Sequence, residues 1–256
     1  MCLILLAWQT HPQFPLIVAA NRDEFYPRRT ARADFWPAHP QVLAGRDLEA
    51  IGTLGTWLGL TRQGRFAALT NYRDPSRHKA DAPSRGRLVA DFLCGHDPID
   101  AYLDSLEAAD YNGFNLLLGD GQRLVAFSNI TRQRHKLAPG IYGLSNATLD
   151  TPWPKVGAGK TALAHALATL PDETALQHLL RDDRIHPDIA LPATGVPLTW
   201  ERLLSAAFIR SPDYGTRCST LIKVGADGTA SFDEQTWLPG GIAGARCRYR
   251  FELEKN

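Results

Sequence analysis

The sequence lacks a dominant charge of either sign. Its 256 residues include 28 lysines and arginines against 27 aspartates and glutamates, which leaves a formal net charge of +1. A chain with this balance has no broad positive field to gather nucleic acid or an anionic membrane surface. We therefore expect no nucleic-acid partner.

Long apolar runs are also missing. Segment 2–8 is apolar, but polar residues follow it at once and no basic residues precede it, so we do not expect a secretory signal peptide. No later segment approaches the roughly 20 apolar residues that a transmembrane helix needs. These features predict a cytoplasmic protein without a transmembrane segment.

Cysteine is scarce, and the spacings typical of metal sites are absent. The eight histidines are scattered, and no C-x-x-C pair occurs among the four cysteines, which are Cys2, Cys94, Cys218 and Cys247. In a reducing compartment such cysteines are thiols. The sequence predicts neither a disulfide framework nor a metal site.

Linkers and low-complexity segments are absent as well. No stretch rich in proline, glycine and serine divides the chain, and single domains with a large β-sheet often reach about 250 residues. The hydrophobic fraction of 44% is ordinary for a globular protein. We predict one domain that spans residues 1–256.

The sequence does contain signals for β-strands and hairpins. The apolar runs 2–8 and 16–20 are typical of two neighbouring strands. Turn pairs also lie between β-type runs, at Gln63-Gly64, Asp120-Gly121 and Asp227-Gly228. Asp-Gly suits the hairpin turn in which both central residues have positive φ. An antiparallel framework is therefore predicted.

Five segments have the spacing of alanine and leucine that is typical of helices, namely 84–93, 97–108, 155–170, 172–180 and 198–208. Strands at both ends of the chain with helices between them indicate two sheets packed together and covered by helices. The predicted class is α+β, a four-layer αββα sandwich of two antiparallel sheets.

One segment resembles a nucleotide-binding motif but lacks an essential residue of it. Gly157, Gly159, Lys160 and Thr161 resemble the end of a phosphate-binding loop, but Pro154 occupies the position of its first glycine. That loop must also follow a buried strand, which segment 151–154 does not resemble. We interpret the segment as the start of a helix.

Cys2 is the first candidate for chemistry. Removal of Met1, which small second residues permit, would place a thiol and an α-amine on one residue. An α-amine titrates near ~8 and a thiol near ~8.5, so the amine can take the thiol proton at neutral pH. The alternative is a small buried hydrophobic residue at the start of a strand.

Polar residues directly follow the second predicted strand, in the sequence Asn-Arg-Asp-Glu from position 21. In a catalytic interpretation, Asp23 accepts hydrogen bonds from the α-amine and Arg22 stabilises the thiolate. A solvated turn is the alternative. Because adjacent strand residues point to opposite faces, both can face Cys2 only if the strand ends or bends there.

Three asparagines at strand ends, Asn71, Asn115 and Asn146, are candidates for stabilising an oxyanion, although asparagine is also a common turn residue. Arg217 begins a predicted strand and could hold a carboxylate or an oxyanion. Its alternative role is a surface salt bridge.

Taken together, these segments resemble the NRDE family, also called the transport and Golgi organization protein 2 family. The resemblance covers nearly the whole chain and is carried by stretches 1–4, 20–24, 55–59, 70–73, 113–116, 145–147, 153–155 and 215–220. The family resembles a branch of the N-terminal nucleophile hydrolases, which share the αββα sandwich. Its cysteine relatives cleave amide bonds.

The resemblance implies a set of site residues by motif. The matching positions, expected to be catalytic, are Cys2, Arg22, Asp23, Asn71, Asn146 and Arg217. The sequence departs from the cysteine hydrolases in one respect, because Arg22 and Asp23 are adjacent here and separated there. The family is also implicated in haem movement and lipid homeostasis.

Two hypotheses follow. The first is a cysteine amidohydrolase that acts on a non-peptide carbon–nitrogen bond of a small-molecule amide and requires no cofactor. The second is a carrier that binds haem or a lipid in the same pocket. In the carrier, Cys2 is either an iron ligand or not a ligand at all.

Overall fold

The structure, a computed structural model, describes residues 2–49 and 54–254. One sheet has six antiparallel strands in the order β10-β1-β2-β11-β12-β13. Its strands are β1 (Cys2–Trp8), β2 (Leu16–Phe25), β10 (Gly140–Leu144), β11 (Tyr214–Val224), β12 (Thr229–Leu238) and β13 (Ile242–Glu252). Because β1 and β2 lie inside the sheet and are covered on both faces, their apolar runs show no alternation.

The second sheet has seven antiparallel strands in sequence order, from β3 to β9. Its strands are β3 (Thr30–Trp36), β4 (His39–Asp47), β5 (Leu58–Thr61), β6 (Phe66–Asn71), β7 (Phe114–Gly119), β8 (Leu124–Ser128) and β9 (Arg134–Lys136). The three predicted hairpins are confirmed, with φ of 79° at Gly64, 87° at Gly121 and 83° at Gly228. The predicted turn with positive φ at both central residues is wrong, because Asp120 and Asp227 do not have positive φ and the connections are longer, at 120–123 and 225–228.

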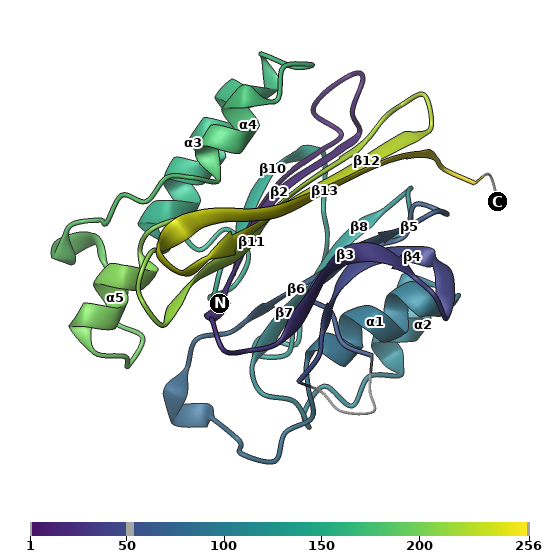
Figure 1. Cartoon of the computed structure of the whole chain (residues 1–256). Helices are drawn as coiled ribbons and strands as arrows, with labels where there is room; N and C mark the ends of the chain where they lie inside the picture. Colours follow the sequence, from purple (N-terminus) through teal and green to yellow (C-terminus); the bar gives the residue numbers. More distant parts are fainter. Residues whose placement is uncertain (1, 50–53, 255–256) are drawn as a thin grey trace.

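Helices cover the outer face of each sheet, and Figure 1 shows the four layers. The predicted αββα sandwich is confirmed. Helices α3 (Pro154–Leu167) and α4 (Thr174–Leu179) lie on the first sheet, α1 (Gly86–Cys94) and α2 (Ile99–Asp104) lie on the second, and α5 (Leu198–Leu204) lies beyond α4. Short 3-10 turns are η1 (Pro75–Arg77), η2 (Asp188–Ala190) and η3 (Pro239–Gly241).

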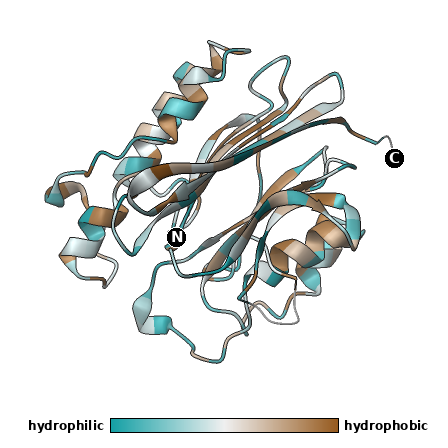
Figure 2. Cartoon of the chain, in the orientation of Figure 1, coloured by the Kyte–Doolittle hydropathy of each residue, from teal (hydrophilic) through white to brown (hydrophobic). Residues whose placement is uncertain are grey.

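The cores lie between these layers. Alternate residues of β1, such as Ile4 and Leu6, meet Phe66 and Leu117 of the second sheet, whereas Leu3 and Leu5 face α3. Figure 2 shows the same pattern as brown stretches along the inner strands.

Segment 157–161 lies within α3, which confirms its interpretation as part of a helix. Helix α3 approaches β1 most closely at Gly159, where an added Cβ would lie 2.7 Å from Leu5 Cδ1. The glycine therefore serves helix–sheet packing. Within the described residues, no helix is long and apolar enough to cross a membrane.

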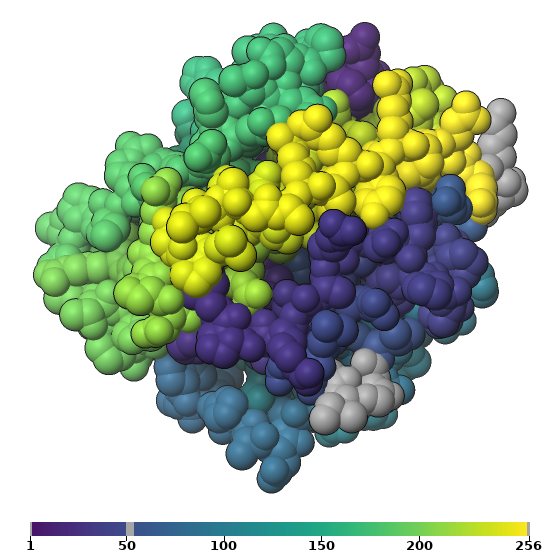
Figure 3. All heavy atoms as spheres, in the orientation of Figure 1, coloured from purple at the N-terminus to yellow at the C-terminus, as the bar shows by residue number. Residues whose placement is uncertain are grey.

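Contacts between the N- and C-terminal strands join the two sheets on one face. Tyr249 Oη of β13 donates a hydrogen bond to the Ala33 carbonyl of β3 at 3.2 Å. Figure 3 shows the yellow C-terminal strand beside the purple N-terminal segments on this face. The candidate site lies at the end of the sandwich where β1 begins.

Candidate active site

Three residues form a row across the first sheet. Arg22 on β2 pairs with Cys2 on β1 and with Cys218 on β11. Both cysteines belong to the core between the sheets, and each is 8% exposed. Arg22 therefore stands between two buried thiols at the end of the sandwich.

Asp23 extends from the other side of β2. The strand continues to Phe25 through the polar residues, so the solvated-turn interpretation of this segment is wrong. Asp23 is 1% exposed, and its Oδ1 accepts a hydrogen bond from Thr216 Oγ1 at 2.8 Å. Arg22 and Asp23 are adjacent strand residues and point to opposite sides of β2. Both nevertheless line the cavity that contains Cys2, because Cys2 lies at the end of β1.

A β-bulge in β11 sets the direction of Arg217. Thr216 pairs with Asp23 and Cys218 pairs with Arg22, which leaves Arg217 as the extra residue. A bulge redirects a side chain out of the regular alternation. Arg217 Nη1 donates hydrogen bonds to the carbonyls of Phe25, Tyr26 and Arg28 at 2.9 to 3.1 Å. The surface salt bridge considered for Arg217 is not formed among the described residues.

The two asparagines expected at the site lie beside each other. Asn146 Nδ2 donates to the Asn71 carbonyl at 2.8 Å, and the Ser145 hydroxyl donates to the Cys2 carbonyl at 3.1 Å. Asn71 lines the cavity, whereas Asn146 is 1% exposed and lies behind it. Segment 145–146 thus connects the end of β6 to the start of β1.

Asn115 has a different place from Asn71 and Asn146. Its Nδ2 donates to Thr70 Oγ1 at 3.1 Å and to the Ala147 carbonyl at 2.8 Å. These bonds hold the segment after Asn146 against β6. Because they use both N–H groups of its side-chain amide, we assign Asn115 a structural role.

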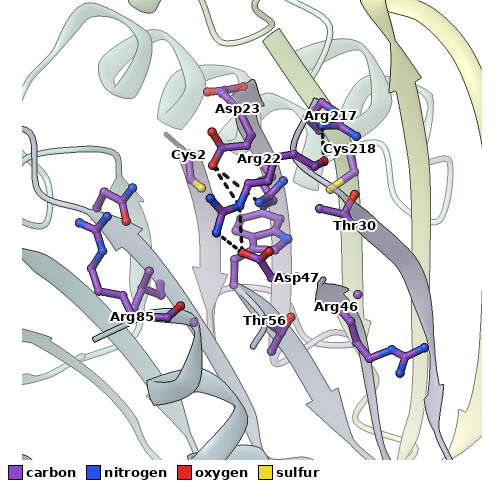
Figure 4. A pocket seen from close by; sticks show the side chains of 18 of the residues that line it. Cys2, Arg22, Asp23, Thr30, Arg46, Asp47, Thr56, Arg85, Arg217 and Cys218 are labelled. Atoms are coloured by element: carbon purple, nitrogen blue, oxygen red, sulfur yellow. Dashed lines mark hydrogen bonds and ion pairs between the residues drawn. The ribbon is translucent and has the colours of Figure 1, made fainter. Parts of the chain in front are cut away.

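The cavity has a volume of about 500 Å³ and is rich in arginine. Figure 4 shows Cys2, Arg22 and Asp23 close together, with Arg85 and Arg217 on opposite sides in this view. The arginines that line it are Arg22, Arg28, Arg32, Arg46, Arg85 and Arg217. Asp47 pairs with Arg28 at 2.6 Å, but among the described residues neither Arg85 nor Arg217 forms an ion pair. The six arginines outnumber the four carboxylates of the lining, Asp23, Glu24, Asp47 and Glu234, which leaves an excess of positive charge.

Burial and nearby charges act on the ionisable groups in opposite directions. Burial raises the pKa of the Cys2 thiol, Asp23 and Glu24 raise it further, and Arg22 lowers it. Burial also raises the pKa of Asp23, which Lys155 and the Thr216 hydrogen bond lower. Arg22 opposes the cost of burying the Cys2 thiolate, and Lys155 opposes the cost of burying the Asp23 carboxylate.

Two basic residues of the site were missed in the sequence. Arg85 precedes α1, its Nη1 donates to the Gly113 carbonyl at 3.0 Å, and it lines the cavity. Lys155 lies in the first turn of α3 and is 2% exposed. The available signal for Lys155 is its place in stretch 153–155, one of those that carry the family resemblance, while nothing local marks Arg85.

We expect Cys2 to be the fastest of the four thiols to react with limiting iodoacetamide. Burial raises the pKa of all four thiols, to about 11 at Cys94 and Cys247. Glu234 raises the pKa of Cys218 and Cys247 further, whereas Arg22 opposes the rise at Cys2, as it does at Cys218. Because the thiolate is the nucleophile, these pKa values slow labelling at neutral pH. Peptide mapping measures the order, and equal or faster labelling of another cysteine would contradict it.

No group of three or more histidine, cysteine, aspartate or glutamate side chains in the described part of the chain could hold a metal ion. The cavity lining contains two thiols, four carboxylates, two side-chain amides and several cations. Such a set suits nucleophilic attack with stabilisation of an oxyanion.

Comparison with known proteins identifies relatives along the whole chain. The family described as Transport and Golgi organisation 2 matches residues 1–239. A Transport and Golgi organization protein 2 homolog from Bos taurus is 41% identical and aligns over 93% of this chain and 94% of its own length. The human homolog is 37% identical and aligns over 99% of this chain and 100% of its own length. The Drosophila melanogaster protein is 30% identical and aligns over 92% of this chain and 92% of its own length.

Among solved structures, a mutant of the conjugated bile acid hydrolase from Clostridium perfringens aligns with 99% of this chain and 92% of its own length. The TM-score is 0.49 and the sequence identity is 9%.

Proposed function

This chain belongs to the Transport and Golgi organisation 2 family, and from that premise and the geometry of the site we propose that it is a cysteine amidohydrolase of the N-terminal nucleophile type. Its substrate is a small molecule with a non-peptide carbon–nitrogen bond. The observation that carries the proposal is the place of Cys2, at the start of a central strand, in a cavity and in direct register with Arg22.

The first step is activation of the thiol. After Met1 is removed, the α-amine of Cys2 takes the proton of its own thiol, while Asp23 orients the amine and Arg22 stabilises the thiolate. The thiolate sulfur then attacks the substrate carbonyl and forms a tetrahedral intermediate. No cofactor is needed for this step.

The remaining steps return the enzyme to its starting state. The amides of Asn71 and Asn146 stabilise the oxyanion, and Arg217 fixes the strand ends around it. The α-ammonium protonates the leaving amine as the carbon–nitrogen bond breaks, which leaves a thioester on Cys2. Water, deprotonated by the α-amine, hydrolyses the thioester and releases the carboxylic acid.

Replacement of Asn146 by alanine is expected to lower kcat by about 10²–10³-fold, the usual cost of removing one oxyanion donor. Because this interaction forms in the transition state, kcat and kcat/KM should fall together. Steady-state kinetics with any hydrolysed amide measures this. A rise in KM with unchanged kcat would instead assign Asn146 to substrate binding.

The lining of the cavity also limits the substrate. Arg85 and Arg217 present positive charge without a carboxylate partner among the described residues, and Arg85 is half-buried. Burial removes part of the hydration of Arg85 and lowers its pKa. An amide that bears a carboxylate or another anionic group fits this lining best.

The test is a screen of acyl amides and acyl amino acids against the purified protein, run in parallel with a haem titration. Hydrolysis of at least one substrate, with weak and unselective haem binding, would support the enzyme. Stoichiometric, tight haem binding without turnover of any amide would overturn it in favour of a carrier that uses the same pocket. Localisation in the cytoplasm is part of the proposal, and fractionation of cells tests it.

A further inference from the structure

A second cavity lies between the two sheets, at the side of the sandwich where β9 and β10 are the edge strands. Its volume is about 370 Å³, which is within the range of small-molecule sites. The residues that line it differ from those that line the Cys2 cavity. The proposed reaction therefore does not account for this second cavity.

Part of its lining is apolar. Ala126 of β8, Leu144 of β10 and Leu137, which follows β9, belong to the core between the sheets. Tyr142 and Leu149 are partly buried and pack against that core. Because two packed sheets lie only about 10 Å apart, a cavity between their facing side chains is narrow and suits a flat apolar molecule.

The most deeply buried polar residue of this lining is Asn115, one of the three asparagines at strand ends. It is 3% exposed and lies two residues before Leu117 on β7, so its side chain is on the inner face of the sheet. Its Nδ2 donates to Thr70 Oγ1 and to the Ala147 carbonyl. Because a carbonyl can only accept, the second bond identifies which end of the side chain is the nitrogen.

The other end of the Asn115 amide is not satisfied by the protein. Its Oδ1 is buried and has no hydrogen-bond partner among the described residues. An acceptor left unpaired in the interior is unfavourable, and most such groups in native proteins have a partner. A ligand with an O–H or N–H group would supply one. Because the oxygen is buried, the lining must shift slightly for that donor to reach it.

The charges of the lining favour an uncharged ligand. In the described part of the chain, neither lysine nor arginine lines this cavity, whereas six arginines line the Cys2 cavity. Its carboxylate, Asp150, accepts hydrogen bonds from Lys160 Nζ at 2.7 Å and from the Gly143 N–H at 2.8 Å. An anion would therefore find no cation in the lining, and an ammonium would have to compete with Lys160 for Asp150.

We propose that this cavity is a second ligand site, which takes a small, flat, uncharged molecule whose O–H or N–H group donates to Asn115 Oδ1. The apolar body of the ligand packs on Leu137, Leu144 and the ring of Tyr142. Binding here is independent of hydrolysis at Cys2, because the two cavities have separate linings.

The probe for the test is naphthol, which has a flat apolar body and one O–H donor and contains no amide bond. It is compared with methoxynaphthalene, which has nearly the same body and no donor, and with naphthoate, which is an anion. All three are substituted at the same ring position. Calorimetric titration of the purified protein measures the affinity, and NMR spectra of the side-chain amides locate the bound probe.

Naphthol is expected to bind in a one-to-one ratio and to shift the side-chain N–H signals of Asn115. Methoxynaphthalene should bind about tenfold more weakly, because it leaves Asn115 Oδ1 unpaired. Naphthoate should bind more weakly still, because a charge enters an apolar cavity without a partner. Prior alkylation of Cys2 should leave the affinity for naphthol unchanged.

His135→Trp tests the place of binding. His135 lies on the exposed edge strand β9, pairs with Ala126 and lines the cavity, so an indole ring there should occupy the ligand's space while keeping the fold. The matched control is His165→Trp, because His165 is exposed on α3, which packs on the outer face of the first sheet. The first variant should lower the affinity for naphthol about tenfold or more, and the control should not change it.

Four results would overturn the proposal. They are the absence of saturable naphthol binding, equal affinities for naphthol and methoxynaphthalene, an unchanged affinity in His135→Trp, and loss of binding when Cys2 is alkylated, which would place the probe in the Cys2 cavity. Melting curves check that both variants fold. If His135→Trp does not fold, the Asn115 signals and the ratio of the two affinities decide. Failure to hydrolyse any amide would remove the proposed function and leave this result unchanged.

Discussion

Cys2→Ala is expected to abolish the hydrolysis of every amide that the wild-type protein cleaves, while leaving the fold intact. The variant removes the only nucleophile in the proposed mechanism and keeps a small second residue, so removal of Met1 is unaffected. Cys2→Ser should retain a trace of turnover, because a hydroxyl is a much weaker nucleophile than a thiolate at neutral pH. Initial rates and melting curves measure both effects.

The matched control is Cys218→Ala. Cys218 lies on the same face of the sheet on the other side of Arg22 and is as buried as Cys2, at 8% exposure. It has no role in the reaction and should keep measurable turnover. Wild-type turnover by Cys2→Ala, or loss of turnover in both variants alike, would show that the thiol of Cys2 is not the nucleophile.

Glu201→Ala is expected to lower the free energy of unfolding by about 3–5 kcal/mol. Glu201 is 4% exposed, and its Oε2 lies 2.7 Å from Arg73 Nη1, whose side chain is also buried. Removing one partner of a buried ion pair leaves the other charge buried and uncompensated, which has this typical cost. The backbone N–H of Thr194 also donates to Glu201 Oε1 at 2.9 Å and would lose its acceptor.

Urea or thermal unfolding measures the effect, and a fall in melting temperature of roughly 10 °C is expected for a chain of this length. Asp188→Ala is the control, because the Arg202–Asp188 pair on the next residue of α5 is about half-exposed at 47% and 50%. Such pairs contribute about 0–1 kcal/mol. Equal losses for the two variants would contradict the account of the buried pair.

Much of the fold could be predicted because its signals are local. Short apolar runs separated by a turn with glycine identify the three hairpins, and each glycine has positive φ. The turn type differs from the prediction, because Asp120 and Asp227 do not have positive φ. Helix ends were less predictable. The helix expected over 97–108 is observed only from Ile99 to Asp104, because packing and not propensity decides where a short helix ends.

Polar residues inside the core could not be predicted from their neighbours. Asn21 was grouped with a solvated turn, yet it is 0% exposed. Its Nδ2 donates to the carbonyls of Leu180 and Ala207 at 2.8 and 2.7 Å, and its Oδ1 accepts from Ser219 at 2.6 Å. All three partners are more than 150 residues away in the sequence, so only the folded chain shows that the asparagine is satisfied.

The candidate site could be predicted only where its residues lie beside a local sequence signal. Cys2 stands out because it begins the first apolar run, and the adjacent Arg22 and Asp23 stand out because they directly follow the second. The bulge that redirects Arg217 depends on pairing between β2 and β11. It has no local sequence signal.

The central claim is that Cys2 becomes the N-terminal residue and carries the acyl group. Intact-mass spectrometry of the natively expressed protein, before and after mixing with a cleaved amide and quenching in acid, tests it most directly. We predict a mass lower than that of the full sequence by one methionine residue, and an added acyl group that maps to the Cys2 peptide. Retention of Met1 in an active protein, or an acyl group on any other residue, would contradict the claim.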